Sequence, residues 1–188
     1  MTIYIALLRG INVGGKNKIK MTDLKRMFEA IGLSRVETYI QSGNVLFESS
    51  EKEDILRKKI ENEIETIFGF SVVVVLRTAA ELEQIIRHCP FSEEEVTEAE
   101  LSNSEGESLY VSLLTQAPSP EKTERLNAFR SEGDEYRIKN RDMYLLFRHS
   151  IRNSKLANNL QKLDVPATTR NWKKINKLYA LAKARTDS

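Results

Sequence analysis

The segment IYIALLRG, Ile3 to Gly10, is a short apolar run rich in β-branched and aromatic residues, and it predicts a buried strand near the start of the chain. A similar run, LYVSLL, returns at Leu109 to Leu114 after an acidic stretch. Tyr4 in the first run matches Tyr110 in the second. Because the same strand opens both halves, the chain is expected to contain an internal duplication.

The residues between these two runs predict, in order, a helix, a β-hairpin, a second helix, a strand and a third helix. The hairpin joins VETYIQ to NVLFES across Ser42-Gly43, and SVVVVLR is the fourth strand. The helices are expected from apolar residues at helical spacing: Leu24, Met27, Phe28 and Ile31; Leu56, Ile60, Ile64 and Ile67; and Leu82, Ile85 and Ile86. Their ends are marked by Thr22 as an N-cap, by Gly32 and Gly69 as stops, and by Thr78 with Glu81 as a capping box.

The second half repeats this order after LYVSLL. SPEKTERLNAF predicts a helix with Ser119 as its cap and Pro120 at its first position. EYRIKN and DMYLLFR predict a second hairpin, and PATTR a last short strand. Further helices are expected at Leu156, Leu160 and Leu163, and after Asn171 with Trp172, Ile175, Tyr179 and Ala182 on one face. Phe47 is matched to Phe147, and Arg77 to Arg170.

These elements predict an α+β fold of two tandem ferredoxin-like β-α-β-β-α-β(-α) units with antiparallel sheets, related by internal duplication. The expected boundaries are residues 1–90 for the first unit, 91–107 for an acidic linker and 108–188 for the second unit. Each half is small, so the two are expected to pack as one body.

Composition limits the classes of protein. Of 188 residues, 40% are apolar and 30% charged, as in an ordinary globular chain. The longest apolar run, Val72 to Leu76, is far short of the ~20 residues that a membrane span needs. One cysteine and no secretory signal favour a soluble cytoplasmic protein without an intramolecular disulfide.

The net charge of +2 hides a segregation of charge along the chain. Basic residues gather between Arg9 and Arg26 and again between Lys162 and Arg185, whereas Ser92 to Ser108 carries seven glutamates and no basic residue. Such runs indicate local fields, and they are also typical of solvated helix faces and linkers.

The loop from Arg9 to Lys20 combines glycines at 10, 14 and 15 with several basic residues. The first two strands of a ferredoxin-like sheet run parallel and end at one edge, so this loop is expected beside the turn Gln41–Asn44. Glycines permit a left-handed backbone, and successive N–H groups near a helix N-terminus bind anions. We therefore predict a site for a phosphate- or carboxylate-bearing ligand, the alternative being a solvated crossover. Its residues are Arg9, Gly10, Asn12, Gly14, Gly15, Lys16, Gln41, Ser42 and Asn44, with Lys18 as a further source of charge.

Three segments, ALLRGINVGG, TYIQSGNVLF and ATTRNW, resemble in that order the bacterial domain-of-unknown-function family 1697. The resemblance spans nearly the whole chain, and it implies a cytoplasmic α+β protein with a duplicated ferredoxin-like arrangement. It implies no established activity, so no catalytic residue is carried over.

Other chemistries receive weaker support. Arg170 and Asn171 precede the last helix, where they can bind an anion or act as core residue and N-cap. Cys89 and its neighbour His88 point to different helix faces, and two histidines with one cysteine cannot build a closed zinc site, so no metal is predicted. Tyr4 and Tyr110 sit where RNA-recognition modules place a base-stacking aromatic, but the third strands lack the paired aromatics, which favours core tyrosines.

Three classes of function therefore remain open. The leading hypothesis is a protein that binds an anionic small molecule at the Arg9–Lys20 loop and the Gln41–Asn44 turn. The second is a nucleic-acid-binding module that uses the basic segments, and the third is a protein-interaction adaptor that uses the acidic stretch. The sequence names no cofactor, no catalytic residue and no oligomeric state, and leaves enzymatic activity open.

Overall fold

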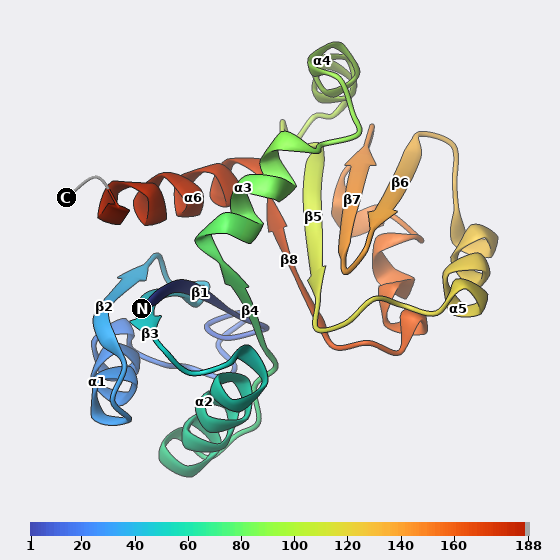
Figure 1. The fold of residues 1–188 in the computed structure, drawn as a ribbon. Helices are drawn as coiled ribbons and strands as arrows, with labels where there is room; N and C mark the ends of the chain where they lie inside the picture. Colours follow the sequence, from blue (N-terminus) through green and yellow to red (C-terminus); the bar gives the residue numbers. More distant parts are fainter. Residues whose placement is uncertain (187–188) are drawn as a thin grey trace. The chain divides into compact units, whose positions relative to one another are not determined.

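The computed structural model describes residues 1–186, which divide into two compact units. The first comprises Met1–Gln84 together with the chain from Lys177 onward, and the second comprises Ile85–Asn176. Each contains one four-stranded antiparallel sheet with its own helices (Figure 1). The predicted α+β fold of two ferredoxin-like units is thus confirmed.

In the first unit the strand order is β2-β3-β1-β4, and β1 pairs antiparallel with both β3 and β4. Because β2 is also antiparallel to β3, β1 and β2 run in the same direction and end at one edge of the sheet. The elements are β1 (Thr2–Leu8), α1 (Met21–Ala30), β2 (Ser34–Tyr39), β3 (Asn44–Ser49), α2 (Glu53–Phe68), β4 (Val74–Thr78) and α3 (Ala79–Arg87).

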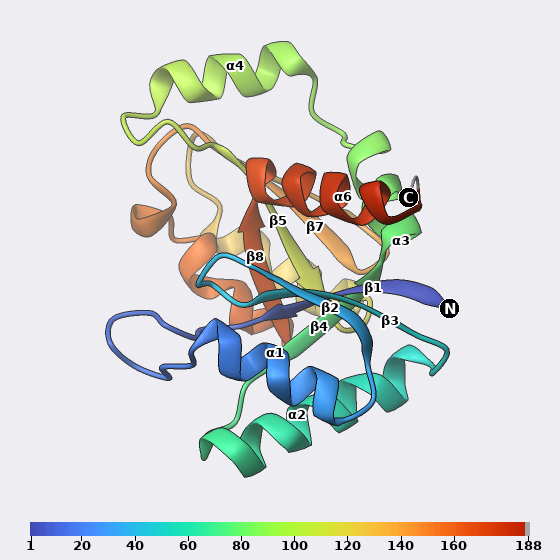
Figure 2. The same cartoon turned by 90° about the vertical axis from the view of Figure 1, so that its left-hand side faces the viewer.

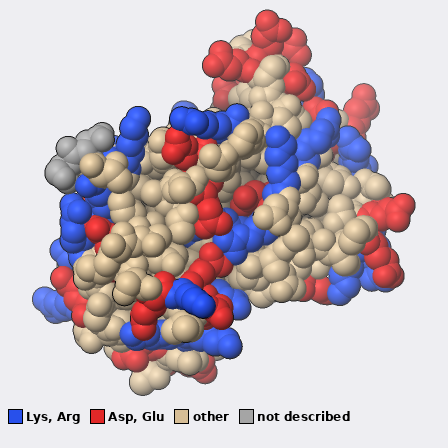
Figure 3. All heavy atoms as spheres, viewed as in Figure 1, with Lys and Arg blue, Asp and Glu red and all other residues tan. Residues whose placement is uncertain are grey.

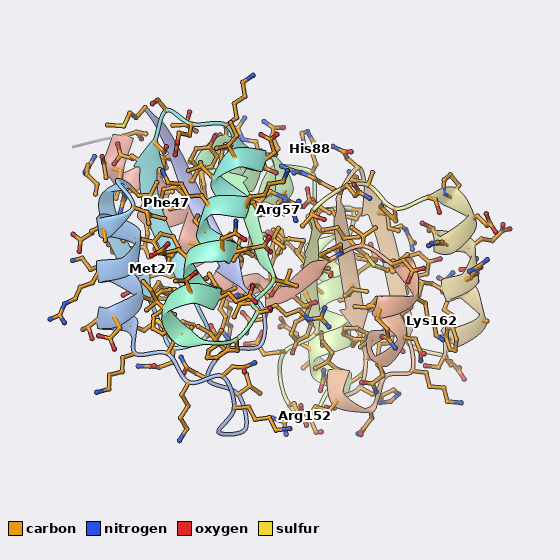
Figure 4. All side chains as sticks on the ribbon, turned by 90° about the horizontal axis from the view of Figure 1, so that it is seen from below. Met27, Phe47, Arg57, His88, Arg152 and Lys162 are labelled. Carbon is orange, nitrogen blue, oxygen red and sulfur yellow. The ribbon has the colours of Figure 1, made fainter. Side chains whose placement is uncertain are left out.

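The core of the first unit lies between its sheet and the helices α1 and α2, which run side by side along one face (Figure 2). Tyr4, Ala6 and Leu8 all lie on this face of β1, because every second side chain of a strand points to the same face. Tyr4 stacks on Phe47 with ring centroids 5.5 Å apart, and Phe28 of α1 meets Phe47 edge-on at 5.6 Å. Phe47 is labelled in Figure 4. Ile5 and Leu7, on the opposite face of β1, are also fully buried.

The second unit repeats this sheet with the order β6-β7-β5-β8. Val111 pairs with Arg170 as Ile5 pairs with Arg77, so the predicted match of the two arginines is confirmed. The match of Phe47 to Phe147 is wrong by two residues, because Tyr4 pairs with Phe47 whereas Tyr110 pairs with Leu145. The elements are α4 (Glu93–Ser102), β5 (Leu109–Leu114), α5 (Pro120–Arg125), η1 (Leu126–Phe129), β6 (Asp134–Lys139), β7 (Asp142–Phe147), η2 (Ile151–Asn153), η3 (Ala157–Leu163), β8 (Ala167–Asn171) and α6 (Trp172–Thr186).

Most of the predicted helix ends are confirmed. Thr78 and Glu81 form the reciprocal capping box of α3, and Ser119 accepts from the Lys122 N–H at the start of α5. Asn171 Oδ1 accepts from the Lys174 N–H, 2.9 Å away, at the start of α6. None of the helices in residues 1–186 combines the length and the apolar character that crossing a bilayer requires.

Two helical predictions need correction. The buried stripe of α2 ends at Phe68, which packs against the core, while Ile67 is 51% exposed. Phe68 follows Ile64 by one turn, so the bulkier side chain takes the inward position. The expected helix around Leu160 is the 3₁₀ helix η3, shorter than its counterpart α2 and ended by Asp164 in a left-handed conformation.

The acidic segment predicted as a linker contains the helix α4. Ser92 Oγ accepts from the Glu95 N–H and Glu95 Oε1 accepts from the Ser92 N–H, both at 3.1 Å, which closes a capping box. Three glutamates in the first turn lie at the positive end of the helix dipole. Figure 3 shows acidic side chains gathered over this helix. The acidic segment is thus a helix with a capped start and a charged surface.

The end of α6 belongs to the first unit, where it carries the mostly buried Arg185. The Arg185 guanidinium lies 3.3 Å from Glu48 of β3 and 3.8 Å from Glu37 of β2, and its side chain is only 8% exposed. Arg35 approaches the same Glu48 carboxylate at 3.1 Å. A fragment that ends at residue 90 therefore lacks an ionic contact of its own sheet.

We predict that Arg185→Met lowers the free energy of unfolding of the full chain by about 1–3 kcal/mol, because it leaves the largely buried Glu48 without this partner. Urea denaturation provides the measurement. Arg125→Met is the matched control, since Arg125 pairs with Glu121 on the exposed surface of α5 and such pairs contribute less than about 0.5 kcal/mol. Equal midpoints for the two variants would contradict the structural role of Arg185.

Candidate functional site

The loop that leaves β1 contains a miniature hairpin. Val13 and Lys16 form an isolated antiparallel bridge, and the Lys16 N–H donates to the Val13 carbonyl at 3.0 Å. Gly14 and Gly15 at its tip have φ of +59° and +73°, which is the pair of positive angles that a type I′ turn requires. The two glycines thus form the turn, and Figure 2 shows the loop extending away from the sheet.

The side chain of Asn12 fixes the base of this loop. Its Nδ2 donates to the carbonyls of Ile19 and Gln41, at 3.0 and 2.8 Å, and its Oδ1 accepts from the Ile19 N–H at 2.8 Å. Asn12 has a φ of +56°, a left-handed conformation that asparagine tolerates better than most residues. One amide therefore joins the two arms of the loop and ties them to the β2–β3 turn.

The turn from Ile40 to Gly43 lies directly against the loop, as predicted from the common edge of β1 and β2. The Leu8 N–H donates to the Gly43 carbonyl at 2.8 Å. A Cβ at Gly43 would lie 2.7 Å from Ile11 Cδ1, so this close approach requires glycine. Asn44 is fully buried, and its Nδ2 donates to the Tyr39 carbonyl and to Ser42 Oγ, each at 3.1 Å.

A pocket of about 860 Å³ opens between this loop and the start of α1. Its volume falls within the range of small-molecule sites, roughly 300–1,000 Å³. Polar, cationic and apolar side chains share its wall with one carboxylate. The lining residues are Asn12, Gly15, Lys18, Ile19, Lys20, Met21, Thr22, Asp23, Gln41 and Phe68.

The helix α1 begins at this pocket without a side-chain cap. Lys20 occupies the N-cap position, and its carbonyl accepts from the N–H groups of Asp23 and Leu24. The expected cap, Thr22, lies inside the helix, so that prediction is wrong by two residues. The first-turn N–H groups and the helix dipole therefore present partial positive charge to the pocket.

Charged side chains add to this field. Lys18 and Lys20 are exposed, and neither takes part in an ion pair within residues 1–186. Asp23, the acidic residue of the lining, lies 3.9 Å from Arg26 on the same helix. The end of the pocket that Lys18 and Lys20 form is thus cationic.

The predicted site residues separate into three groups. Asn12, Gly15 and Gln41 line the pocket. Arg170 and Asn171 belong to the second unit. The others lie in the loop or the turn without lining the pocket: Arg9, Gly10, Gly14, Lys16, Ser42 and Asn44.

The lining also contains residues that the sequence did not indicate, namely Lys20, Met21, Thr22, Asp23, Phe68 and the buried Ile19. The first four were missed because α1 starts earlier than the Thr22 cap suggested. Phe68 directly precedes the helix stop Gly69, and extending the stripe of α2 by one full turn from Ile64 would have placed it inward.

Arg170 and Asn171 have structural contacts in the second unit. Arg170 is 7% exposed, and its Nη1 donates to Thr168 Oγ1 at 2.7 Å and to the Thr169 carbonyl at 3.0 Å. Burial lowers the pKa of its guanidinium to about 10. Asn171 is occupied as the N-cap of α6.

The duplication supplies an internal comparison for the loop. The first unit connects β1 to α1 through Arg9–Lys20, whereas the second connects β5 to α5 through the much shorter Thr115–Ser119. The hairpin turn is also longer in the first unit, where it spans Ile40–Gly43, than in the second, where it is Asn140–Arg141. Since the same sheet forms with short connections, the fold does not require the long loop.

Other candidate groups have structural roles. Tyr4 is 6% exposed on the helix-covered face of its sheet, and its hydroxyl donates to the Glu51 carbonyl at 2.9 Å, which confirms a core tyrosine. Tyr110 meets Phe147 edge-on and packs against the core of the second unit. Burial raises the pKa of the half-buried Cys89 thiol, which disfavours a thiolate nucleophile.

Comparison with known proteins gives a family and a fold. Residues 1–144 match the model of a family described as a protein of unknown function, DUF1697. The conserved bacterial protein SP0830 from Streptococcus pneumoniae has a similar structure, with a TM-score of 0.74 and 24% sequence identity over 96% of this chain and 98% of that one. No curated protein matches the chain.

We predict that Asn12→Asp weakens the loop anchor, because the carboxylate keeps the left-handed backbone and the acceptor but loses both donated hydrogen bonds. The expected loss of stability is about 1–2 kcal/mol, with faster hydrogen exchange at the Ile19 amide, measured by NMR. Asn17→Asp is the control, since Asn17 has a similar φ of +51° but donates only one exposed bond of 3.3 Å. Unchanged exchange at Ile19 in Asn12→Asp would rule out this anchor.

Proposed function

The chain belongs to the DUF1697 family, which brings no established activity, and on the geometry of its pocket we propose that it binds a small molecule bearing a phosphate or carboxylate group. The ligand's anionic group lies between Lys18 and Lys20, in front of the first turn of α1. The polar side chains of Asn12 and Gln41 border the same space. The observation that carries the proposal is the pocket itself, formed by a loop that the fold does not need.

Physical chemistry supports an anion at this place. Lys18 and Lys20 border the pocket without a carboxylate partner within residues 1–186, so an anion there would meet two uncompensated positive charges. The N–H groups of Met21 and Thr22, which donate to no backbone carbonyl within residues 1–186, add hydrogen-bond donors, and the helix dipole is favourable. The anchored loop base holds Lys18 and Lys20 close to that helix end, which reduces the ordering cost of binding.

The other two hypotheses receive less support. A base-stacking role for Tyr4 conflicts with its burial under α1 and α2. The acidic segment is a capped helix, and acidic charge alone does not specify a partner. We also propose that the protein works in the cytoplasm, in keeping with its single cysteine.

The proposal predicts that replacing both pocket lysines, Lys18→Gln with Lys20→Gln, weakens binding of inorganic phosphate at least about tenfold, because two charge-assisted contacts are lost. The matched control is Lys16→Gln with Lys25→Gln, which removes the same total charge from exposed positions outside the pocket and should change affinity less than about twofold. NMR titration with phosphate, followed at the amides of residues 20–23, measures both.

Equal weakening in the two double variants would mean that only the general field attracts the anion, and the pocket would not be its site. Phosphate-induced shifts that avoid residues 20–23 would have the same meaning. Native mass spectrometry of the purified protein offers an independent check, since a retained ligand is expected to carry an acidic group.

A further inference from the structure

The cationic pocket does not end at α1. A second hollow of about 490 Å³ lies between α1 and the last turn of α2, lined by Asp23, Arg26, Met27, Ala30, Ile67 and Phe68. Asp23 and Phe68 line both hollows, so the two meet at these side chains. The two hollows are therefore neighbours, one bordered by Lys18 and Lys20 and the other lined by apolar side chains together with Asp23 and Arg26.

The apolar end follows one face of α1. Asp23, Met27 and Ala30 recur at the spacing of four and three residues that marks a helix face, with Arg26 beside them. Across from them, α2 supplies Ile67 and Phe68, and Figure 4 shows Met27 between the two helices. At 1.5 Å per residue, this part of α1 is roughly 10 Å long.

Ile67 is the large exposed apolar side chain on the wall of the second hollow. It is 51% exposed, whereas Ile64 is buried and Phe68 is partly buried against the core. Ile67 lies on the wall of the apolar hollow, so an apolar group held there would cover a side chain that is otherwise in water. The lysines at the other end supply the matching charge for a ligand with one anionic end.

We propose that the ligand is a single linear apolar chain with a terminal phosphate or carboxylate, its head at Lys18 and Lys20 and its chain between α1 and α2. This deepens the proposed function and rests on it. The Asp23 carboxylate lines both hollows and lies 3.9 Å from Arg26, which partly compensates that cation, so Lys18 and Lys20 are the cations left for the ligand's anionic end.

The test is a series of soluble alkyl phosphates from methyl to decyl, each below its micelle concentration, measured by isothermal titration calorimetry. Affinity should rise with chain length, by at most about fourfold per buried methylene, and then level off when the groove is full. Ile67→Asp should flatten this dependence. Ile55→Asp is the matched control, because Ile55 is also an exposed isoleucine of α2, at 52%, outside both hollows.

The results separate the two proposals. If methyl phosphate binds in a way that depends on Lys18 and Lys20, but longer alkyl phosphates bind no more tightly, the proposed site for the apolar chain is overturned. The anion site then stays intact. Chain-length dependence that survives Ile67→Asp would place the chain elsewhere and overturn the inference as well. Binding of long alkyl phosphates that ignores Lys18→Gln with Lys20→Gln would overturn the anion site and, with it, this inference.

A membrane lipid could present the same head group, and a second arm distinguishes that source. Sedimentation with vesicles that contain phosphatidic acid should not depend on Ile67, since the groove takes one free chain. Vesicle binding that is abolished by Ile67→Asp but retained in Ile55→Asp would overturn the assignment to a free ligand.

Discussion

The burial of β1 is the constraint on which the first unit depends. This strand pairs with β3 on one side and β4 on the other, and Ile5, Ala6, Leu7 and Leu8 have no exposed surface. Its last residues are fixed by backbone hydrogen bonds, from the Leu8 N–H to Gly43 and from the Arg9 N–H to Val73. The chain therefore leaves the sheet at one defined point, beside the β2–β3 turn. This point fixes where the Arg9–Lys20 loop of the candidate site begins.

The two units show what the fold needs and what it does not. Both form the same four-stranded sheet with the same pairing of β1 or β5 with its neighbours. Only the first connects its opening strand to its first helix through a long, anchored loop, and only the first has a long second helix whose end reaches the pocket. Binding residues concentrate in loops on a rigid scaffold. The long loop that only the first unit has is also the loop that carries Lys18 and Lys20, so both observations favour the same site.

The sequence predicted the strands and their duplication well, because buried strands carry continuous apolar runs and hairpin turns carry glycine. It also predicted that the loop and the turn meet, since the direction of β1 and β2 follows from the order of elements. It failed where one residue decides between two local structures: at Thr22, which looked like a cap although the helix starts at Met21, and at Ile67, which is exposed while Phe68 packs against the core. Glycines 14 and 15, predicted for the binding loop, form the turn at its tip with positive φ angles, and of the two Gly15 lines the pocket.

The site itself could be predicted only in part for a related reason. Asn12 and Gln41 were predicted for the site and line the pocket, but the hydrogen bond from the Asn12 side chain to the Gln41 carbonyl could not be predicted from the local sequence. Arg9, which looked well placed at the end of a rigid strand, does not line the pocket, since the chain turns at Gly10 with a φ of +69°. Which side chains face one hollow depends on turn geometry more than on residue type.

The central claim is that one groove in the first unit holds an anionic head at its cationic end and an apolar chain between its two helices. A crystal structure grown with decyl phosphate tests this most directly. Electron density is expected for the phosphate beside Lys18, Lys20 and the first turn of α1, with the chain running past Phe68 toward Ile67 and Ala30. A decyl phosphate that binds in solution but is found in the crystal at any other place on the protein would contradict it.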